Sequence, residues 1–290
     1  MYEGRIRMRW ILLCFMGTLL WGTSQTVHSS VGTYVESKSF KNSVQKEDGN
    51  IYGVNADIHI DHAEYKVAYE HGYTNTKHPP LKENLKIDKL FLKYNYDFQN
   101  DFAFNINYIH VLHDNIAITD KGKTYGAGLT YRYQKQLNTN FTQYYTDYAD
   151  FNVLQSDLKM VYAMKIEDVK IKITSDTKYI VIDEKNRNTF TKNADDNYLT
   201  SGLKLHLLYD NWHFASAAYV GKRVFAVMDD GFKLQHHAME FDRTYAVAIG
   251  KNISNVVLRL QYIYSHAKEL PVENDNVEIS NIRFLLNYRF

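Results

Sequence analysis

Residues 281–290 read NIRFLLNYRF, and this stretch decides the fold class. Every second residue is apolar, namely Ile282, Phe284, Leu286, Tyr288 and Phe290, and most residues between them are polar. Successive side chains of a β-strand point to opposite faces of the sheet, so the pattern predicts a strand with one apolar and one polar face.

The same alternation recurs along most of the chain. In GKTYGAGLTYRY, residues 122–133, Leu129 and Tyr131 fall on one face, and Thr130 and Arg132 fall on the other. Beyond the first thirty residues no apolar run approaches the length of a membrane-spanning helix. Strands are predicted at 31–40, 50–60, 64–74, 85–98, 101–113, 123–134, 139–148, 152–166, 168–182, 197–210, 212–227, 236–250, 255–267 and 277–290.

Short connections alternate with longer, more polar ones. The short set is 61–63, 99–100, 134–138, 167, 211 and 251–254, and the long set is 41–49, 75–84, 114–122, 183–196, 228–235 and 268–276. Only the link at 149–151 departs from this order. Short turns on one side and long loops on the other predict an all-β, antiparallel transmembrane barrel of about 14 strands. A soluble β-sandwich also alternates, but 24 tyrosines and strands of about ten residues are unusual for one.

The first residues predict a secretory signal peptide. Arg5, Arg7 and Arg9 precede the apolar run 10–21, and 27–29 fits a cleavage site, so residues 1–29 are expected to be removed and 30–290 to form the barrel. A single membrane anchor is the alternative, but the run is short for one. The only cysteine, Cys14, lies in this segment. The near-neutral net charge of +1 gives no reason to expect nucleic acid as a partner.

The chain resembles bacterial outer-membrane β-barrel proteins, porins especially. The resemblance rests on the barrel-like pattern and on the terminal run of Phe284, Leu286, Tyr288 and Phe290, which is similar to the membrane-insertion signal of that group. It implies an outer-membrane location among lipid and lipopolysaccharide, recognition by the outer-membrane assembly machinery, and transport of small polar solutes. Aromatic residues cluster near the predicted short turns, as an interfacial girdle requires.

Strand parity assigns side chains to the lumen. The polar faces carry fourteen basic and eight acidic residues, so the expected wall is positive. A basic wall in a narrow channel concentrates anions, although solvated or paired charges would need no such function. The predicted pore-lining residues are Lys93, Arg132, Lys159, Lys170, Lys172, Lys204, Arg223, Arg259 and Arg283.

These observations favour a narrow, porin-like diffusion channel, with 183–196 as the loop best able to constrict it. A non-conducting barrel with partner-binding loops is the alternative, and an outer-membrane hydrolase is a further one. Asp229, Asp230, His236 and His237 are a candidate set for a barrel protease, but loop acids and histidines are common, so no enzyme is predicted. The histidine pairs do not form a convincing metal site, and no cofactor is expected.

Overall fold

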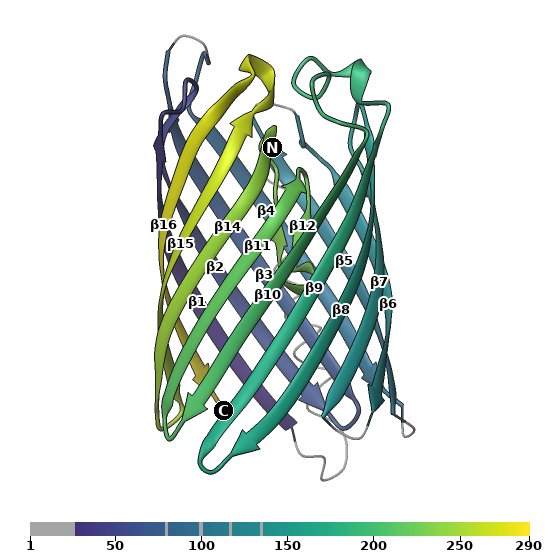
Figure 1. Ribbon diagram of the computed structural model, residues 1–290, viewed down its shortest axis with the longest axis vertical. Helices are drawn as coiled ribbons and strands as arrows, with labels where there is room; N and C mark the ends of the chain where they lie inside the picture. Colours follow the sequence, from purple (N-terminus) through teal and green to yellow (C-terminus); the bar gives the residue numbers. More distant parts are fainter. Residues whose placement is uncertain (1–26, 79–80, 99–100, 116–117, 134–135) are drawn as a thin grey trace, which may run out of the picture.

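The computed structural model describes residues 27–78, 81–98, 101–115, 118–133 and 136–290. Fourteen strands form a closed antiparallel barrel in which each pairs with its neighbours in the chain, β11 pairs with β14, and β16 closes against β1 (Figure 1). The predicted fold class and closure are therefore confirmed. No helix in these ranges is long and apolar enough to cross a membrane.

The barrel strands run for 11 to 16 residues, long enough to cross a bilayer at a tilt. They are β1 (Val27–Lys41), β2 (Lys46–Ile60), β3 (Ala63–Thr76), β4 (Leu85–Asp97), β5 (Phe102–Asp114), β6 (Lys123–Tyr133), β7 (Leu137–Asp147), β8 (Asn152–Ile166), β9 (Val169–Asp183), β10 (Asn197–Tyr209), β11 (Trp212–Arg223), β14 (Met239–Ile253), β15 (Val256–Glu269) and β16 (Asn274–Arg289). A two-stranded hairpin of β12 (Val227–Met228) and β13 (Lys233–Leu234) is separate from the barrel sheet. Three short 3-10 turns complete the structure: η1 (Lys185–Arg187), η2 (Asp229–Gly231) and η3 (Leu270–Val272).

The start of β1 differs from the sequence prediction. β1 begins at Val27, three residues before the predicted start of the mature chain at residue 30, and Val27 is in register with Ile60 of β2. The signal peptide stays a prediction, because residues 1–26 lie outside the described part of the chain. The connection between β1 and β2 is also shorter than predicted, since β2 already begins at Lys46.

The outer surface is apolar, as lipid requires. Leu203 and Val247 are each 57% exposed on the outside of the sheet, and neighbouring outward positions carry similar side chains. Aromatic rings gather near the short turns, where Tyr96, Phe98 and Phe104 contact one another with centroids 5.3 to 5.9 Å apart. This arrangement is the girdle expected at the periplasmic interface.

Candidate functional site

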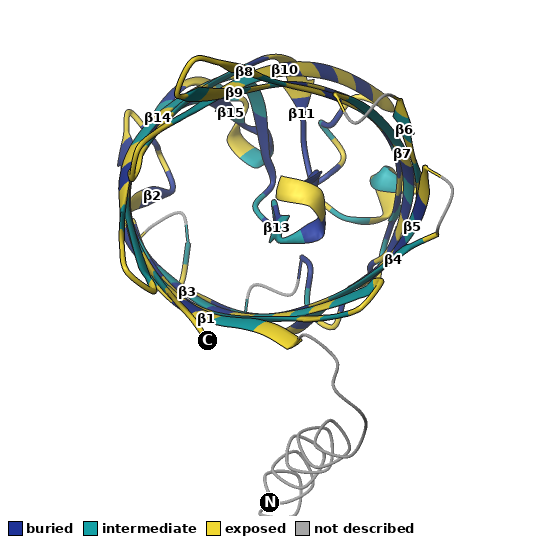
Figure 2. Cartoon of the chain, turned by 90° about the horizontal axis from the view of Figure 1, so that it is seen from below, coloured by how far each residue is buried: buried dark blue, intermediate teal, exposed yellow. Residues whose placement is uncertain are grey.

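One connection leaves the wall and folds into the barrel. β11 ends at Arg223 and β14 begins at Met239, and residues 224–238 between them, here called the inward loop, carry β12, η2 and β13 into the lumen (Figures 1 and 2). The prediction of a strand through 227 was therefore wrong, and 183–196 is not the segment that reaches the middle of the barrel. The missed signal was the run from Val224 to Met228, in which five consecutive apolar residues break the alternation.

The first part of the inward loop, residues 224–228, is its root and packs in an apolar core. Val224, Phe225 and Ala226 are fully buried, and Phe225 lies against Phe151 with ring centroids 4.9 Å apart. The same cluster includes residues of the extracellular halves of β8, β9 and β10, namely Val153, Ile180, Ile182 and Tyr198. Strand parity predicts polar side chains throughout the lumen, but this part of the inner face is apolar because it packs against the root.

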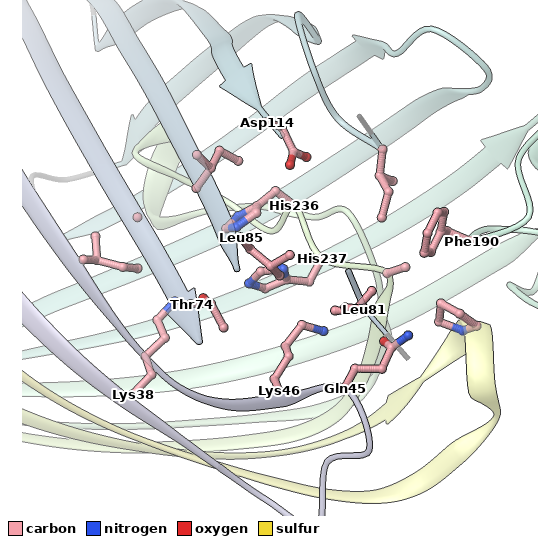
Figure 3. Close-up of a pocket in the computed structure, with 16 residues that line it drawn as sticks. Lys38, Gln45, Lys46, Thr74, Leu81, Leu85, Asp114, Phe190, His236 and His237 are labelled. Atoms are coloured by element: carbon pink, nitrogen blue, oxygen red, sulfur yellow. The ribbon is translucent and has the colours of Figure 1, made fainter. Parts of the chain in front are cut away.

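Other extracellular loops pack onto this core. Phe190 and Ala194 of the β9–β10 loop join the cluster, and Asn193 Nδ2 donates to the Leu270 carbonyl at 3.1 Å. Leu270 N–H in turn donates to the carbonyl of Ala238, also at 3.1 Å. Figure 3 shows Phe190 in the lining of the same pocket as the histidine pair of the inward loop, His236 and His237. The extracellular half is therefore filled by several loops, and the β9–β10 loop forms part of the cover.

Polar contacts from the wall fix the hairpin. Gln155 Oε1 accepts the Val227 N–H at 2.8 Å, and Gln155 Nε2 donates to the Val227 carbonyl, also at 2.8 Å. On the β4 side, Lys89 forms an ion pair with Glu70 and donates to the Leu234 carbonyl at 3.3 Å. Both strands of the hairpin thus have a hydrogen-bonding partner in the wall.

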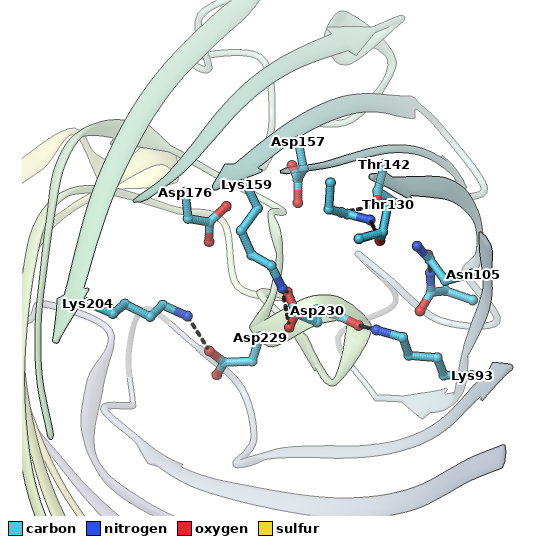
Figure 4. Close-up of polar contacts among 12 residues, drawn as sticks. Lys93, Asn105, Thr130, Thr142, Asp157, Lys159, Asp176, Lys204, Asp229 and Asp230 are labelled. Atoms are coloured by element: carbon cyan, nitrogen blue, oxygen red, sulfur yellow. Dashed lines mark hydrogen bonds and ion pairs between the residues drawn. The ribbon is translucent and has the colours of Figure 1, made fainter. Parts of the chain in front are cut away.

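The tip of the inward loop, residues 229–231, is held by three lysines from separate strands (Figure 4). Lys159 of β8 contacts both carboxylate oxygens of Asp230 at 2.6 and 2.7 Å, and Lys93 of β4 donates to the Asp230 carbonyl at 3.0 Å. Lys204 of β10 contacts Asp229 at 3.4 Å. The sequence predicts these aspartates in a long loop outside the barrel, but they lie in the lumen among lysines that were predicted to line an open pore.

The charge of the tip is maintained by these neighbours. Asp230 belongs to the loop and not to a membrane-spanning strand. Enclosure in the barrel raises the pKa of its carboxyl, but the ammonium groups of Lys159 and Lys93 lower it by more, so the pKa lies below its usual range. The carboxylate is therefore ionised near neutral pH.

A cavity of about 370 Å³ lies beside the tip. Its charged lining comprises seven basic side chains, Lys38, Lys89, Lys172, Lys204, Arg223, Lys233 and Arg259, and two acidic ones, Glu70 and Asp229. With histidines neutral, the cavity therefore has a formal excess of five positive charges. Such an excess in a confined lumen attracts anions.

Arg223 is one of the two most enclosed of these cations, together with Lys89. It is 2% exposed, and its guanidinium lies 5.5 Å from the ring of Tyr219 and 5.3 Å from the ring of Phe241. Its Nη2 donates to Thr244 Oγ1 at 2.5 Å. The aromatic faces stabilise the cation where no carboxylate among the described residues contacts it.

The predicted pore-lining residues separate into groups. Lys172, Lys204, Arg223 and Arg259 line the cavity, whereas Lys93 and Lys159 hold the tip. Two others are paired away from it: Arg283 contacts Glu36 at 2.5 Å and Arg132 contacts Asp97 at 2.5 Å. Lys170 lies one alternation beyond Lys172, next to the β8–β9 turn. Two cavity-lining cations were not predicted from the sequence, namely Lys38 on β1 and Lys233, which lies on the inward loop and not on a barrel strand.

The predicted insertion-signal residues all lie on the outside. Phe284, Leu286 and Tyr288 project from β16 and are 36 to 45% exposed, and Phe290 follows the strand. Phe290 N–H donates to the Ser29 carbonyl of β1 at 2.9 Å. Their position fits contact with lipid, and their role as a signal stays a prediction.

The described residues do not assemble a metal site. No group of three or more His, Cys, Asp or Glu side chains is placed for a cation in these parts of the chain. The rings of His236 and His237 lie 4.0 Å apart, but His236 Nδ1 is 3.4 Å from the Lys89 ammonium. Positive charge at this distance opposes cation binding.

The closed antiparallel sheet, its apolar exterior and its aromatic girdle define the protein as a bacterial outer-membrane β-barrel. No protein-family model matches the sequence, and no curated protein matches it. The fold is similar to that of a bacterial polysaccharide outer membrane secretin, with a TM-score of 0.58, 9% identity, and coverage of 90% of this chain and 98% of that one.

Two further solved structures have the same fold. The toluene transporter TbuX of Ralstonia pickettii gives a TM-score of 0.53 at 8% identity, covering 92% of this chain and 90% of its own. The outer membrane protein Omp33 of Acinetobacter baumannii gives 0.50 at 10% identity, covering 91% and 99%. At such identities the likeness establishes the fold alone.

Proposed function

We propose that the protein is a porin-like outer-membrane channel for passive diffusion of small polar solutes, with a preference for anions. The cavity beside the inward loop carries the proposal, because it combines room for a small solute with five excess positive charges. Solutes pass between the wall and the tip, and the packed extracellular half makes movement of the loops part of conduction.

The polar lumen surface also supports transport over catalysis. Its ionised groups are distributed around the barrel as pairs, such as Lys178 with Asp157 at 2.6 Å, and as single cations, such as Arg259 in the cavity lining. Assembly by the outer-membrane machinery and contact with lipopolysaccharide belong to the same proposal, as does removal of the signal peptide.

Recording of ion currents in planar lipid bilayers tests the function. A channel of this kind gives stepwise conductance, and its reversal potential in a potassium chloride gradient has the sign of anion preference. The preference weakens as salt rises, because the Debye length falls from about 10 Å at 0.1 M to about 3 Å at 1 M. Cation preference at low salt would contradict the proposal that the basic cavity attracts anions into the lumen.

A second candidate is a non-conducting barrel whose loops bind a partner. The fully buried side chains of Phe225 and Leu270 in the extracellular half favour it, since they belong to a packed cover. Protein that inserts into bilayers, shown by heat-modifiable migration and protease protection, yet gives no conductance would support this candidate against the channel. Hydrolysis of lipid or peptide by the same material would support an enzyme.

A further inference from the structure

The tip of the inward loop occupies an anion site that the wall itself provides. Lys93, Lys159 and Lys204 come from three different strands and converge on two adjacent carboxylate-bearing residues, Asp229 and Asp230 (Figure 4). Without the tip, these lysines would face the lumen without a counter-charge from the loop. The loop therefore supplies an internal anion to a basic wall.

The tip and the root of the loop are held in different ways. The side chains of Asp229 and Asp230 are 51% and 54% exposed, whereas Phe225 in the root is fully buried. Ion pairs with an exposed carboxylate contribute little each, so the tip is easier to displace than the buried root. The backbone is also conformationally demanding here, since Asp229 and Asp230 have φ of 49° and 58°.

Space for a competing anion lies next to the tip. The 370 Å³ cavity is lined by Lys204 and Asp229 together with Arg223, Lys233 and Arg259. A solute that enters this cavity reaches the ammonium group that Asp229 contacts, with further cations beside it. A solute that carries carboxylates makes the same type of charge-assisted hydrogen bond there as the tip makes with its lysines.

We propose that this cluster is a binding site for small dicarboxylates, which displace the Asp229–Asp230 carboxylates from Lys204 and Lys159. The inference rests on the proposed function, and it adds the solute class and the competitor. The two carboxylates of the solute replace the two of the tip, so binding and displacement of the tip are one equilibrium. A ligand that favours the displaced tip shifts the loop toward that state.

Isothermal titration calorimetry of the folded protein in detergent, with succinate as the probe, measures the competition directly. D229N/D230N removes the internal anion and is expected to tighten succinate binding about three- to tenfold, because each exposed ion pair lost is worth up to roughly fivefold. K159Q/K204Q removes the ligands and is expected to weaken binding at least tenfold. K165Q, near the β8–β9 turn, is the matched control and leaves the affinity unchanged.

A disulfide that fixes the tip provides the second arm. An ideal Cβ at Gly231 lies 3.5 Å from the Cβ of Asn107 on β5, within the range of disulfides. In a C14S background, N107C/G231C is expected to lose succinate affinity at least tenfold when oxidised and to regain it with dithiothreitol. Heat-modifiable migration of each variant confirms folding, and the reduced form controls for strain at Gly231, whose φ is +94°.

The outcomes separate the two proposals, because calorimetry does not require ion flow. Unchanged succinate affinity in D229N/D230N, or undiminished affinity in the oxidised double cysteine, would overturn the competition. Equal affinity for propionate or inorganic phosphate would overturn the dicarboxylate class. Anion-selective currents without succinate binding would refute only this inference, whereas succinate binding to a non-conducting barrel would refute only the channel.

Discussion

Replacement of Gln155 by leucine should release the inward loop while leaving the barrel intact. Gln155 satisfies both the N–H and the C=O of Val227 in a buried part of the lumen. Leucine has a similar size but no polar atom, so both backbone groups lose their partner when the loop is inside. Asp157, which also contacts Gln155, keeps its ion pair with Lys178 at 2.6 Å.

The size of the effect follows from those two groups. A buried donor or acceptor left without a partner costs about 1–3 kcal/mol, so the inward state should lose about 2–6 kcal/mol relative to a state in which water reaches Val227. Each 1.4 kcal/mol is a factor of ten, so the lower bound already shifts the equilibrium roughly 30-fold. The hydrogen-bond ladder between β11 and β14 does not involve Val227 and should be unaffected.

Thiol labelling at Ala226 measures the shift. Ala226 is fully buried in the root, so A226C in a C14S background reacts with a maleimide only when the loop leaves its core. Q155L should raise the labelling rate at least tenfold and increase the open-channel current. Q143L, which removes a contact with Ser156 at 2.8 Å and none with the loop, is the control. Equal rates in Q155L and Q143L would refute the assigned role of Gln155.

Three further predictions concern the wall. L203R, on the lipid-facing side of β10 near mid-strand, should lower the free energy of unfolding, measured by refolding into lipid, by about 2–4 kcal/mol. I171R, close to a turn, should lower it by about 0–1 kcal/mol, and equal losses for the two variants would contradict the assigned depths. R259Q should reduce anion preference in bilayer recordings more than K204Q, which removes the same single charge, because the loop already neutralises Lys204; the reverse order would contradict that pairing. Y288D should lower the amount of heat-modifiable protein in the outer membrane, whereas normal amounts would contradict a role of the terminal strand in assembly.

The barrel was predictable from sequence because lipid allows little freedom. Every backbone group in hydrocarbon must be paired and the outward face must be mainly apolar, so each strand repeats the same period. The strands β6 and β9, for example, agree with the predicted segments to within one residue. The basic character of the lumen followed from the same parity.

The inward loop was not predictable on these grounds. The run from Val224 to Met228 is compatible with a strand that simply continues, and only packing across the lumen shows where it goes. Lys159 and Asp230 form an ion pair although they are 71 positions apart in the sequence. The alternation of polar and apolar residues within a strand does not indicate which residues so far apart come into contact. The sequence therefore indicated the three lysines as pore-lining residues and the two aspartates as loop acids, but not that they contact one another.

The apolar inner face that receives the root has a consequence for any attempt to widen this barrel. Deleting the inward loop would leave Val153, Ile180, Ile182 and Tyr198 uncovered, as an apolar patch on β8, β9 and β10 near the extracellular opening. An apolar lining favours dewetting, which blocks ions without any physical obstruction. A permanently open variant therefore needs hydrophilic replacements in this patch as well as a shorter loop.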